Sequence, residues 1–532
     1  MIRSAKRLLS AADLRNRIGG SDATKGVDGE ERSIRQLSTR VAILVGSLFL
    51  LAAAAALISW IVIAVAHVDD TYLTTHVSGT RMALARYLDH GVLYSPVYDG
   101  VHFGGTRIMP LSILTHTSFA KMTGDYLISG KLVSYLMLAA VLITVTVILR
   151  RLGCSLPVTL ILVVSLLITD PGYRAGFAML GDTLPVLLGL LALLSIVEVP
   201  RMGGVVGAAV LCALALMAKL SALWAPLAIV VWMLTFDRRR LRVYLATYVG
   251  SVTALMLVFN AVSSGRFFDN VFGFSLAGVG GLSAAIDAPS HLVRILFFNT
   301  PVLWALVPVA LFAVGISFVR RDVTIYNIAL VCHVPLLLVV FSDIGADTNH
   351  LIDLQVLSVL AIGHAVAAAR WSRVGELGPR RWQVTAPQAV AGLLFIWIVA
   401  TQLVVLLPDL HTAVDSLRSG GSDDGRPLEG RIDSGSTILS EDPYIPVALN
   451  QTPVVADPFM LPRIAERDPE AVGELIRRIE SKEFDFVVLA FALERDWWWE
   501  SYHFGTDVIE AVGRAYEFSG REDGYYLYEP AP

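Results

Sequence analysis

The chain has 532 residues, of which 55% are hydrophobic and 17% charged, and its formal net charge is −4. This composition is typical of an integral membrane protein, and it excludes a soluble globular enzyme of ordinary composition. Its three cysteines, Cys154, Cys212 and Cys332, lie in or beside apolar runs, so the sequence offers neither a disulfide framework nor a cysteine-based metal cluster.

The N-terminal residues 1–40 are polar and basic, with nine Lys/Arg against five Asp/Glu. The run from Val41 to Ala66 carries no charge and is long enough to cross a bilayer. It begins too late and is too long for a cleavable signal peptide. The positive-inside rule therefore predicts a cytoplasmic, disordered tail over 1–40, with the chain emerging on the outer face after Ala66.

Two adjacent carboxylates, Asp69 and Asp70, come directly after this run. A carboxylate pair at membrane level is costly, because like charges repel and desolvation adds to the cost. One Asp could cap the next helix, since Asp is a good N-cap residue, but the second would stay unexplained. The pair therefore favours a functional site over a helix cap.

Two short amphipathic segments follow the acidic pair. The first has Gly91 as a suitable stop and carries an apolar helical stripe formed by Leu73, Val77, Leu84 and Leu88. The second runs from Ile108 to Gly124. We expect both to lie along the membrane surface as interfacial helices, because they are too short and too polar to span.

These stretches, VDDTYLTTHVSGTRMALARYLDHG and FGGTRIMPLSILTHTSFAKMTGDYLISGKLVS, resemble the first outer loop of the GT-C glycosyltransferases. This family of polytopic transferases uses polyprenyl-phosphate sugars and includes protein O-mannosyltransferases and the lipid A aminoarabinose transferase. Its members carry an acidic motif after the first transmembrane helix and two juxtamembrane helices after the motif. The resemblance covers most of the membrane region in layout and this loop in detail.

Apolar segments recur along the rest of the chain. If consecutive segments cross the membrane in alternating directions, every strongly basic cluster falls on the inner side. With the first run they number eleven, the others being 126–149, 156–169, 180–199, 205–218, 220–236, 243–262, 292–319, 324–341, 351–369 and 389–407. We therefore expect a polytopic α-helical membrane protein with a GT-C-like domain over 41–407. Its first outer loop, 67–125, carries the Asp-Asp motif.

The C-terminal part is acidic, with 25 Asp/Glu against 11 Lys/Arg from Pro408 onward, and this concentration of acid does not favour nucleic-acid binding. A flexible linker rich in Gly, Ser and Asp occupies 408–436. Strand-like runs at 437–439, 453–456, 484–491 and 525–529 and helical stretches at 468–482 and 506–514 then predict a small α/β extracytoplasmic domain over 437–532. It shows no Gly-rich phosphate loop and no nucleophile motif.

The run Trp497-Trp498-Trp499 has two interpretations. A hydrophobic anchor at the membrane interface is favoured, because Trp is enriched there. A stacking surface for a sugar is the alternative.

Further site candidates lie at the outer ends of the segments. Asp182 is either a helix N-cap, with Pro185 in the first turn, or a second functional acid, as the resemblance to aminoarabinose-type transferases implies. Six basic residues on the outer side suggest a site for the donor phosphate: Arg81, Arg107, Arg174, Lys219, Arg266 and Arg294. Lys219 resembles the lipid-phosphate lysine of the family. Asn349 and His350 resemble a polar outer-end motif of its members, although a lone His is more often structural.

Together these features predict an inner-membrane glycosyltransferase that moves a sugar from a polyprenyl-phosphate donor to an extracytoplasmic glycan, lipid or protein, with inversion. An Asp would act as general base, and cations would stabilise the departing phosphate. No cofactor is expected. Adjacent Asp residues without His or Glu at ligand spacing are thin evidence for a metal, so we assign no metal ligand and leave a divalent metal as an open alternative.

The principal rival is a polytopic lipid or glycan transporter or flippase. Such a protein would carry charges near the bilayer midplane and broken helices in paired halves. Here the acids gather at one face and the sequence shows no internal repeat. A non-catalytic scaffold with the acidic domain as receptor is a second rival.

Overall fold

The computed structural model describes residues 47, 50–199, 201–278, 282–371, 407–418, 428, 430–433 and 435–532. The chain divides into two compact units, Met1–Ala55 and Ala56–Pro532, and the fold below is that of the second. The predictions for the tail 1–40, for nearly all of segment 389–407 and for much of the linker 408–436 lie outside the described residues.

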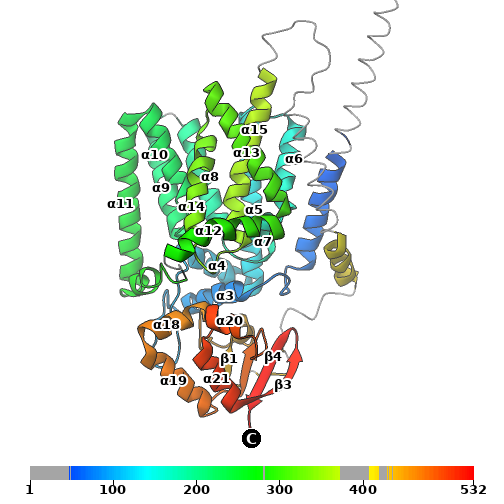
Figure 1. Cartoon of the computed structure of the whole chain (residues 1–532), viewed down its shortest axis with the longest axis vertical. Coiled ribbons are helices and arrows are strands. Elements are labelled where there is room, and N and C mark those ends of the chain that lie inside the picture. Colours follow the sequence, from blue (N-terminus) through cyan, green and yellow to red (C-terminus); the bar gives the residue numbers. More distant parts are fainter. Residues whose placement is uncertain are drawn as a thin grey trace, which may run out of the picture. The chain divides into compact units, whose positions relative to one another are not determined.

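Apolar helices form a bundle in the second unit (Figure 1). Within the described ranges, four are long and apolar enough to cross a membrane: α5 (Tyr126–Arg151), α11 (Arg238–Val262), α13 (Pro301–Arg320) and the stretch Thr348–Ala368, which joins η3 (Thr348–Leu351) to α15 (Ile352–Trp371). Shorter apolar helices are Leu50–Ala66, α8 (Thr183–Glu198), α9 (Met202–Ala218), α10 (Trp224–Phe236) and α14 (Ile325–Val340). The chain is a polytopic helical membrane protein, whereas the count of eleven spans stays a prediction.

One predicted segment is broken and one predicted loop is helical. The segment 156–169 corresponds to α6 (Leu156–Leu167), but the short loop expected after it is α7 (Asp170–Phe177), and the two helices form a pair bent by 66°. Pro171 lies in the first turn of α7, where a proline is tolerated. The segment 292–319 is not one helix, because η2 (Ile295–Asn299) ends before Pro301 starts α13.

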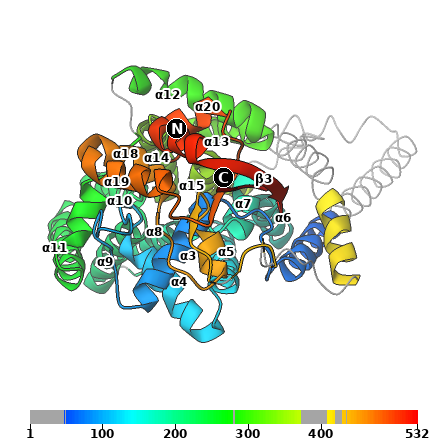
Figure 2. The ribbon, with the colours of Figure 1, turned by 90° about the horizontal axis from the view of Figure 1, so that it is seen from below.

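The loop predicted over 263–291 contains helical structure that the sequence analysis missed. It holds η1 (Phe268–Phe272) and most of α12 (Leu282–Arg294). α12 packs against α14 and η2, and Figure 2, which views the molecule from below, shows it at the edge of the bundle.

The two predicted interfacial helices are α3 (His76–Asp89) and α4 (Pro110–Thr123). α3 packs against α4 and against α17 (Tyr444–Ala448), so it lies between the bundle and the C-terminal region (Figure 1). The polar side of α3 also contacts the C-terminal region. Arg86 is 7% exposed and donates two hydrogen bonds to Asn450, at 2.9 and 2.6 Å. α4 begins with a first-turn proline and ends at Gly124, which has a left-handed φ of 75°.

The C-terminal region forms a four-stranded mixed sheet of order β1-β2-β4-β3. Its strands are β1 (Ile438–Ser440), β2 (Phe486–Leu489), β3 (Tyr516–Glu522) and β4 (Tyr525–Pro530), of which β1 and β2 are parallel and the other pairs antiparallel. Its helices include α18 (Leu461–Arg467), α19 (Pro469–Glu480), α20 (Asp496–Ser501) and α21 (Thr506–Ala515). The Asp468 side chain caps α19 by accepting from the Ala471 N–H at 3.0 Å, at the start of the helical stretch predicted over 468–482.

One strand of this sheet was missed and one predicted strand is wrong. β3 has weak strand composition, but Asp523 and Gly524 adopt positive φ between β3 and β4 and make a two-residue hairpin turn. The run 453–456 does not join the sheet. Val455 instead makes an isolated parallel bridge to Phe103 of the first outer loop.

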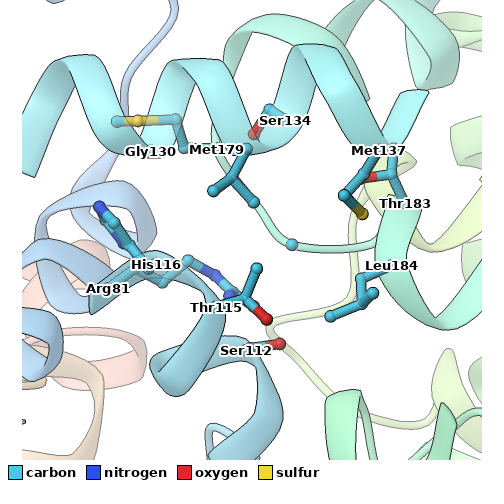
Figure 3. A pocket seen from close by; sticks show the side chains of 12 residues that line it. Arg81, Ser112, Thr115, His116, Gly130, Ser134, Met137, Met179, Thr183 and Leu184 are labelled. Atoms are coloured by element: carbon cyan, nitrogen blue, oxygen red, sulfur yellow. The ribbon is translucent and has the colours of Figure 1, made fainter. Parts of the chain in front are cut away.

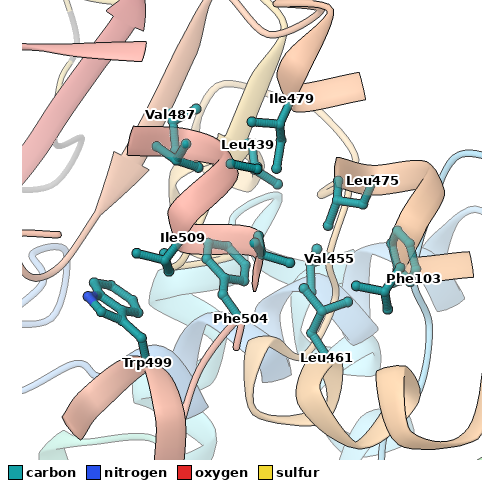
Figure 4. Packing of buried hydrophobic residues seen from close by; sticks show 14 of the residues in the cluster. Phe103, Leu439, Val455, Leu461, Leu475, Ile479, Val487, Trp499, Phe504 and Ile509 are labelled. Atoms are coloured by element: carbon teal, nitrogen blue, oxygen red, sulfur yellow. The ribbon is translucent and has the colours of Figure 1, made fainter. Parts of the chain in front are cut away.

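Phe103 is 1% exposed and belongs to the hydrophobic core of the C-terminal region, together with Leu461, Leu475 and Phe504 (Figure 4). The first outer loop therefore contributes a side chain to this core. Trp499, 1% exposed, is also part of it, so the interpretation of the whole Trp run as a membrane anchor is wrong. Trp497, 52% exposed, is the part of the run left on the surface.

Candidate active site

The two carboxylates of the acidic pair differ sharply in environment. Asp69 is exposed, whereas Asp70 is 3% exposed. Asp70 is bonded to the His67 ring, with Nδ1 and Oδ2 2.5 Å apart, and accepts from the Tyr72 N–H at 2.9 Å. Burial raises the pKa of Asp70, but the bonds from His67 and Tyr72 outweigh it and hold the pKa below its ordinary value. Neither Asp caps a helix, because α3 begins after Thr75.

Residues that the sequence analysis did not select support the acidic pair. The His67 and Tyr72 rings stack with centroids 4.1 Å apart. Lys131 of α5 is fully buried and donates from Nζ to the Tyr72 carbonyl at 2.5 Å. A lysine inside an apolar helix is costly without a partner, and this cost was the signal in the sequence that could have identified Lys131.

A second centre joins four residues predicted separately. The Lys219 ammonium forms an ion pair with Asp182, which is 3% exposed. Lys219 also donates to Nδ1 of His350 at 3.1 Å, and the Asn349 amide donates to the other Asp182 oxygen at 3.1 Å. Burial raises the pKa of Asp182, but the charges of Lys219 and His350 and the bonds from Lys219 and Asn349 together outweigh it and hold the pKa below its ordinary value. Asp182 is the N-cap residue of α8, as one of the two interpretations predicts, but its side chain makes no capping hydrogen bond and bonds to Lys219 and Asn349 instead.

Arg81 lies on another side of this centre. Its guanidinium packs against Gly181, where an added Cβ would come within 2.2 Å of the Arg81 Nη1 atom. Gly181 also has a φ of 73°, a conformation that glycine adopts without strain. Asp182 acts on Arg81 electrostatically, but its ion pair is with Lys219.

The other predicted cations are not gathered at this centre by any contact among the described residues. Arg107 forms an ion pair with Asp343. The Nε atom of Arg174 lies 3.2 Å from Oδ1 of Asp170, and its Nη1 atom lies 3.7 Å from Oδ2 of Asp347. Arg266 donates to the Tyr94 carbonyl at 3.4 Å, and Arg294 is exposed on α12. Arg107 still acts electrostatically on His350 of this centre, and the single six-residue phosphate site stays a prediction.

Helix α7 connects the two acidic centres. Tyr173 exchanges a hydrogen bond with Tyr72 at 2.8 Å, on the side of the acidic pair. The next residue, Arg174, reaches Asp347, which directly precedes η3 and its residues Asn349 and His350. Consecutive side chains of one short helix thus contact the segments that carry both acids.

A buried polar network ties the C-terminal region to α3. Glu441 is 1% exposed and accepts from the Trp498 Nε1–H at 2.7 Å, and its carboxylate is also 2.7 Å from Nδ1 of His503. The His503 ring meets the His76 ring of α3 edge to face, with centroids 4.2 Å apart. Trp498 is therefore held by a hydrogen bond as well as by packing.

A divalent metal was left open from the sequence. In the part of the chain that the structure describes, no group of three or more His, Cys, Asp or Glu side chains is arranged to hold a metal ion.

Comparison with known proteins identifies the fold. The chain superposes on ArnT from Cupriavidus metallidurans bound to undecaprenyl phosphate with a TM-score of 0.54 at 13% identity, over 91% of this chain and 98% of that one. It superposes on the Archaeoglobus fulgidus oligosaccharyltransferase tethered to an acceptor peptide with a TM-score of 0.52 at 12% identity, over 91% and 74% of the two chains. No protein-family model matches the sequence, and no curated protein matches it. The fold is that of the GT-C glycosyltransferases, as the first outer loop predicts.

Proposed function

We propose that this protein is a membrane glycosyltransferase that takes a sugar from a polyprenyl phosphate and transfers it to an extracytoplasmic acceptor. The observation that carries the proposal is the exposed Asp69 beside the buried Asp70, in the loop where the GT-C fold places its acidic motif. The ArnT structure, which contains undecaprenyl phosphate, and the archaeal structure with its acceptor peptide support a lipid-phosphate donor and a separate acceptor.

Asp69 is the proposed general base. A base must reach the acceptor hydroxyl and carry a carboxylate that is not already paired, and Asp69 is the exposed member of the acidic pair. Asp70 is held by His67 and Tyr72, so we assign it the role of fixing the backbone around Asp69. Direct attack of the acceptor on the anomeric carbon, with the lipid phosphate leaving, inverts that centre.

Asp182 and Lys219 are proposed to organise the charge next to the donor. A carboxylate already paired with an ammonium is a poor proton acceptor, because the positive charge stabilises its ionised form. Lys219 and Arg81 together leave this centre one positive charge in excess over Asp182, which suits a departing phosphate.

The proposed orientation places the tail in the cytoplasm, and both the acidic pair and the C-terminal region outside an inner membrane. A cysteine at Ser440 would be a poor probe of this, since Ser440 is 5% exposed. Glu522 is exposed at the end of β3. In a chain without its three native cysteines, Glu522→Cys should react with a membrane-impermeant thiol reagent on intact cells whose outer envelope is permeabilised. Labelling only after lysis of the inner membrane would overturn the orientation.

The function itself is tested by deleting the gene and analysing the envelope glycans, glycolipids and glycoproteins. We expect one sugar to disappear from one acceptor while its polyprenyl-phosphate form accumulates. An unchanged set of envelope sugars, with no accumulated donor, would count against a transferase.

A further inference from the structure

Tyr72 fixes the position of the acidic pair. Its N–H donates to Oδ1 of Asp70 at 2.9 Å, and its ring stacks on the His67 ring, whose Nδ1 atom lies 2.5 Å from Oδ2 of Asp70. Both oxygens of the buried carboxylate therefore depend on where Tyr72 lies. The Tyr72 carbonyl also accepts from Lys131, so the backbone of Tyr72 is bonded through its N–H and through its carbonyl.

The Tyr72 hydroxyl begins a hydrogen-bond chain that leaves the first outer loop. It lies 2.8 Å from the Tyr173 hydroxyl, and Tyr173 donates to Oδ2 of Asp409 at 3.0 Å. Because a hydroxyl has one proton, a Tyr173 that donates to Asp409 accepts from Tyr72. Burial raises the pKa of Tyr72 above its ordinary value, so its hydroxyl keeps the proton that it donates. A carboxylate at the end of the chain polarises Tyr173 and strengthens the bond that Tyr173 accepts from Tyr72.

Helix α7 holds Tyr173 in place. Phe177 of this helix is fully buried, and its ring centroid lies 4.7 Å from that of Tyr173 and 5.7 Å from that of Tyr72. The segment after α7 is packed tightly against α5, because a Cβ added at Gly130 would clash with the Met179 sulfur (Figure 3). Tyr173 therefore lies on a helix that is fixed by packing at its C-terminal end.

Asp409, at the far end of the chain, is half-buried near the start of a helix formed by residues 407–418. It falls in the linker predicted over 408–436 and was not a site candidate. Among the described residues it forms no ion pair, whereas Asp415 of the same helix is exposed and pairs with His411 and Arg418. The charge of Asp409 is thus directed at the tyrosine chain rather than at a neighbouring cation.

We propose that Asp409 is a positioning residue for the acidic pair and acts on Asp69 and Asp70 through Tyr173 and Tyr72. The inference rests on the proposed function, in which Asp69 must lie within hydrogen-bond reach of the acceptor hydroxyl. A small displacement of a catalytic group lowers the rate steeply, so a distant carboxylate that fixes the loop affects turnover. Asp409 itself takes no proton and contacts neither substrate.

The first test measures transfer kinetics in liposomes. Asp409→Ala removes the acceptor of the Tyr173 hydroxyl, and the turnover number should fall about tenfold, as expected for one hydrogen bond to a charged group. The donor half-saturation should change little. Asp409→Asn keeps an oxygen that can accept, so it should retain most of the rate. Asp415→Ala, which removes an exposed acid from the same helix, is the matched control and should keep the parental rate.

A double-mutant cycle tests whether Asp409 acts through the tyrosine chain. Tyr173→Phe removes a single hydroxyl and both of its hydrogen bonds while keeping the ring that packs on Phe177. If the chain carries the effect of Asp409, the double variant Tyr173→Phe/Asp409→Ala should be no slower than Tyr173→Phe alone. Thermal unfolding of the same proteins shows that each is folded.

The second test needs no catalysis. Hydrogen exchange of the full-length protein in detergent, followed by mass spectrometry, reports how often the backbone of residues 67–75 opens. Exchange in this stretch should be faster in Asp409→Ala than in the unaltered protein and in Asp415→Ala, because Tyr72 is held less firmly.

The outcomes separate this inference from the proposed function. Parental turnover in Asp409→Ala, losses that add in the double variant, or unchanged exchange in residues 67–75 would overturn the inference while a glycosyltransferase stands. A change confined to donor half-saturation would also overturn it, because it would assign Asp409 to donor binding. Absence of transfer by the unaltered protein would contradict the proposed function, and the exchange rates would then still decide whether Asp409 holds the loop.

Discussion

The two acidic centres use carboxylates in opposite ways. At the first outer loop, Asp70 is buried in hydrogen bonds while its neighbour Asp69 remains exposed. Before α8, Asp182 is buried and neutralised by Lys219. The first centre leaves one carboxylate available to take a proton, and the second leaves none. Among the described residues Asp69 forms no ion pair, and we infer that such an accessible acid distinguishes the proposed catalytic centre from the electrostatic one.

The largest effect is expected at Asp69. Asp69→Asn removes the proposed base, so the transfer rate should fall about 10²- to 10⁴-fold, while membrane levels stay normal because the side chain is exposed. Initial rates in liposomes measure this. Asp89→Asn, an exposed acid at the end of α3, is the control and should retain the parental rate. A parental rate in Asp69→Asn would contradict its role as base, and a parental rate in Asp70→Asn as well would place the chemistry elsewhere.

Lys219→Met should damage stability more than any change at the acidic pair. It leaves the Asp182 carboxylate buried without its ammonium, a loss of about 3–5 kcal/mol for a buried pair. The double variant Asp182→Asn/Lys219→Met should recover most of it, because both charges are gone. Thermal unfolding of the four proteins in one detergent completes the cycle. Additive losses in the double variant would mean that the pair is not coupled.

Replacing His67 should lower the transfer rate by an intermediate amount. His67→Ala removes the ring that bonds the Asp70 carboxylate, and a hydrogen bond to a charged group contributes about 1.5–3 kcal/mol. His67→Gln should restore part of the rate, since an amide can still donate. The turnover number should fall with little change in donor half-saturation if Asp70 positions Asp69. A change confined to half-saturation would instead assign His67 to donor binding.

Replacing Asp442 should give the smallest effect, a change in how thermal stability depends on pH. Burial raises its pKa to about 6, against an ordinary value of 3.8. The folded protein therefore binds the proton more tightly than the unfolded chain, so this stabilisation is present below pH 3.8 and is lost as pH rises through about 6. Asp442→Asn should flatten the fall in thermal stability between about pH 4 and about pH 6. An unchanged fall would assign it to other groups.

The first outer loop shows how far sequence reasoning reached. Asp69 and Asp70 could be selected because charges at membrane level are rare in apolar sequence. The helices α3 and α4 followed from local periodicity and stop signals, which are properties of neighbouring residues. The different environments of Asp69 and Asp70 could not be predicted from the sequence, because burial of Asp70 depends on how the loop folds back on His67 and Tyr72.

Contacts between segments that are distant in the sequence could not be predicted. Asp182, Lys219 and His350 were separate candidates in the sequence. Lys219 lies 37 residues from Asp182 and 131 from His350, and such spacings do not predict an ion pair or a hydrogen bond. The same limit hid the insertion of Phe103 into the C-terminal core. The break before α13 was local and could have been predicted from Pro301 itself.

The most direct test compares transfer rates of Asp69→Asn and Asp182→Asn/Lys219→Met in the same liposomes, with the same polyprenyl-phosphate sugar. The double variant removes both charges of the Asp182–Lys219 pair and keeps Arg81, whereas Asp69→Asn keeps everything except the proposed base. We predict that Asp69→Asn is the slower of the two by at least about tenfold, at unchanged thermal stability. A rate for Asp69→Asn equal to or above that of the double variant would contradict the assignment of catalysis to the first outer loop.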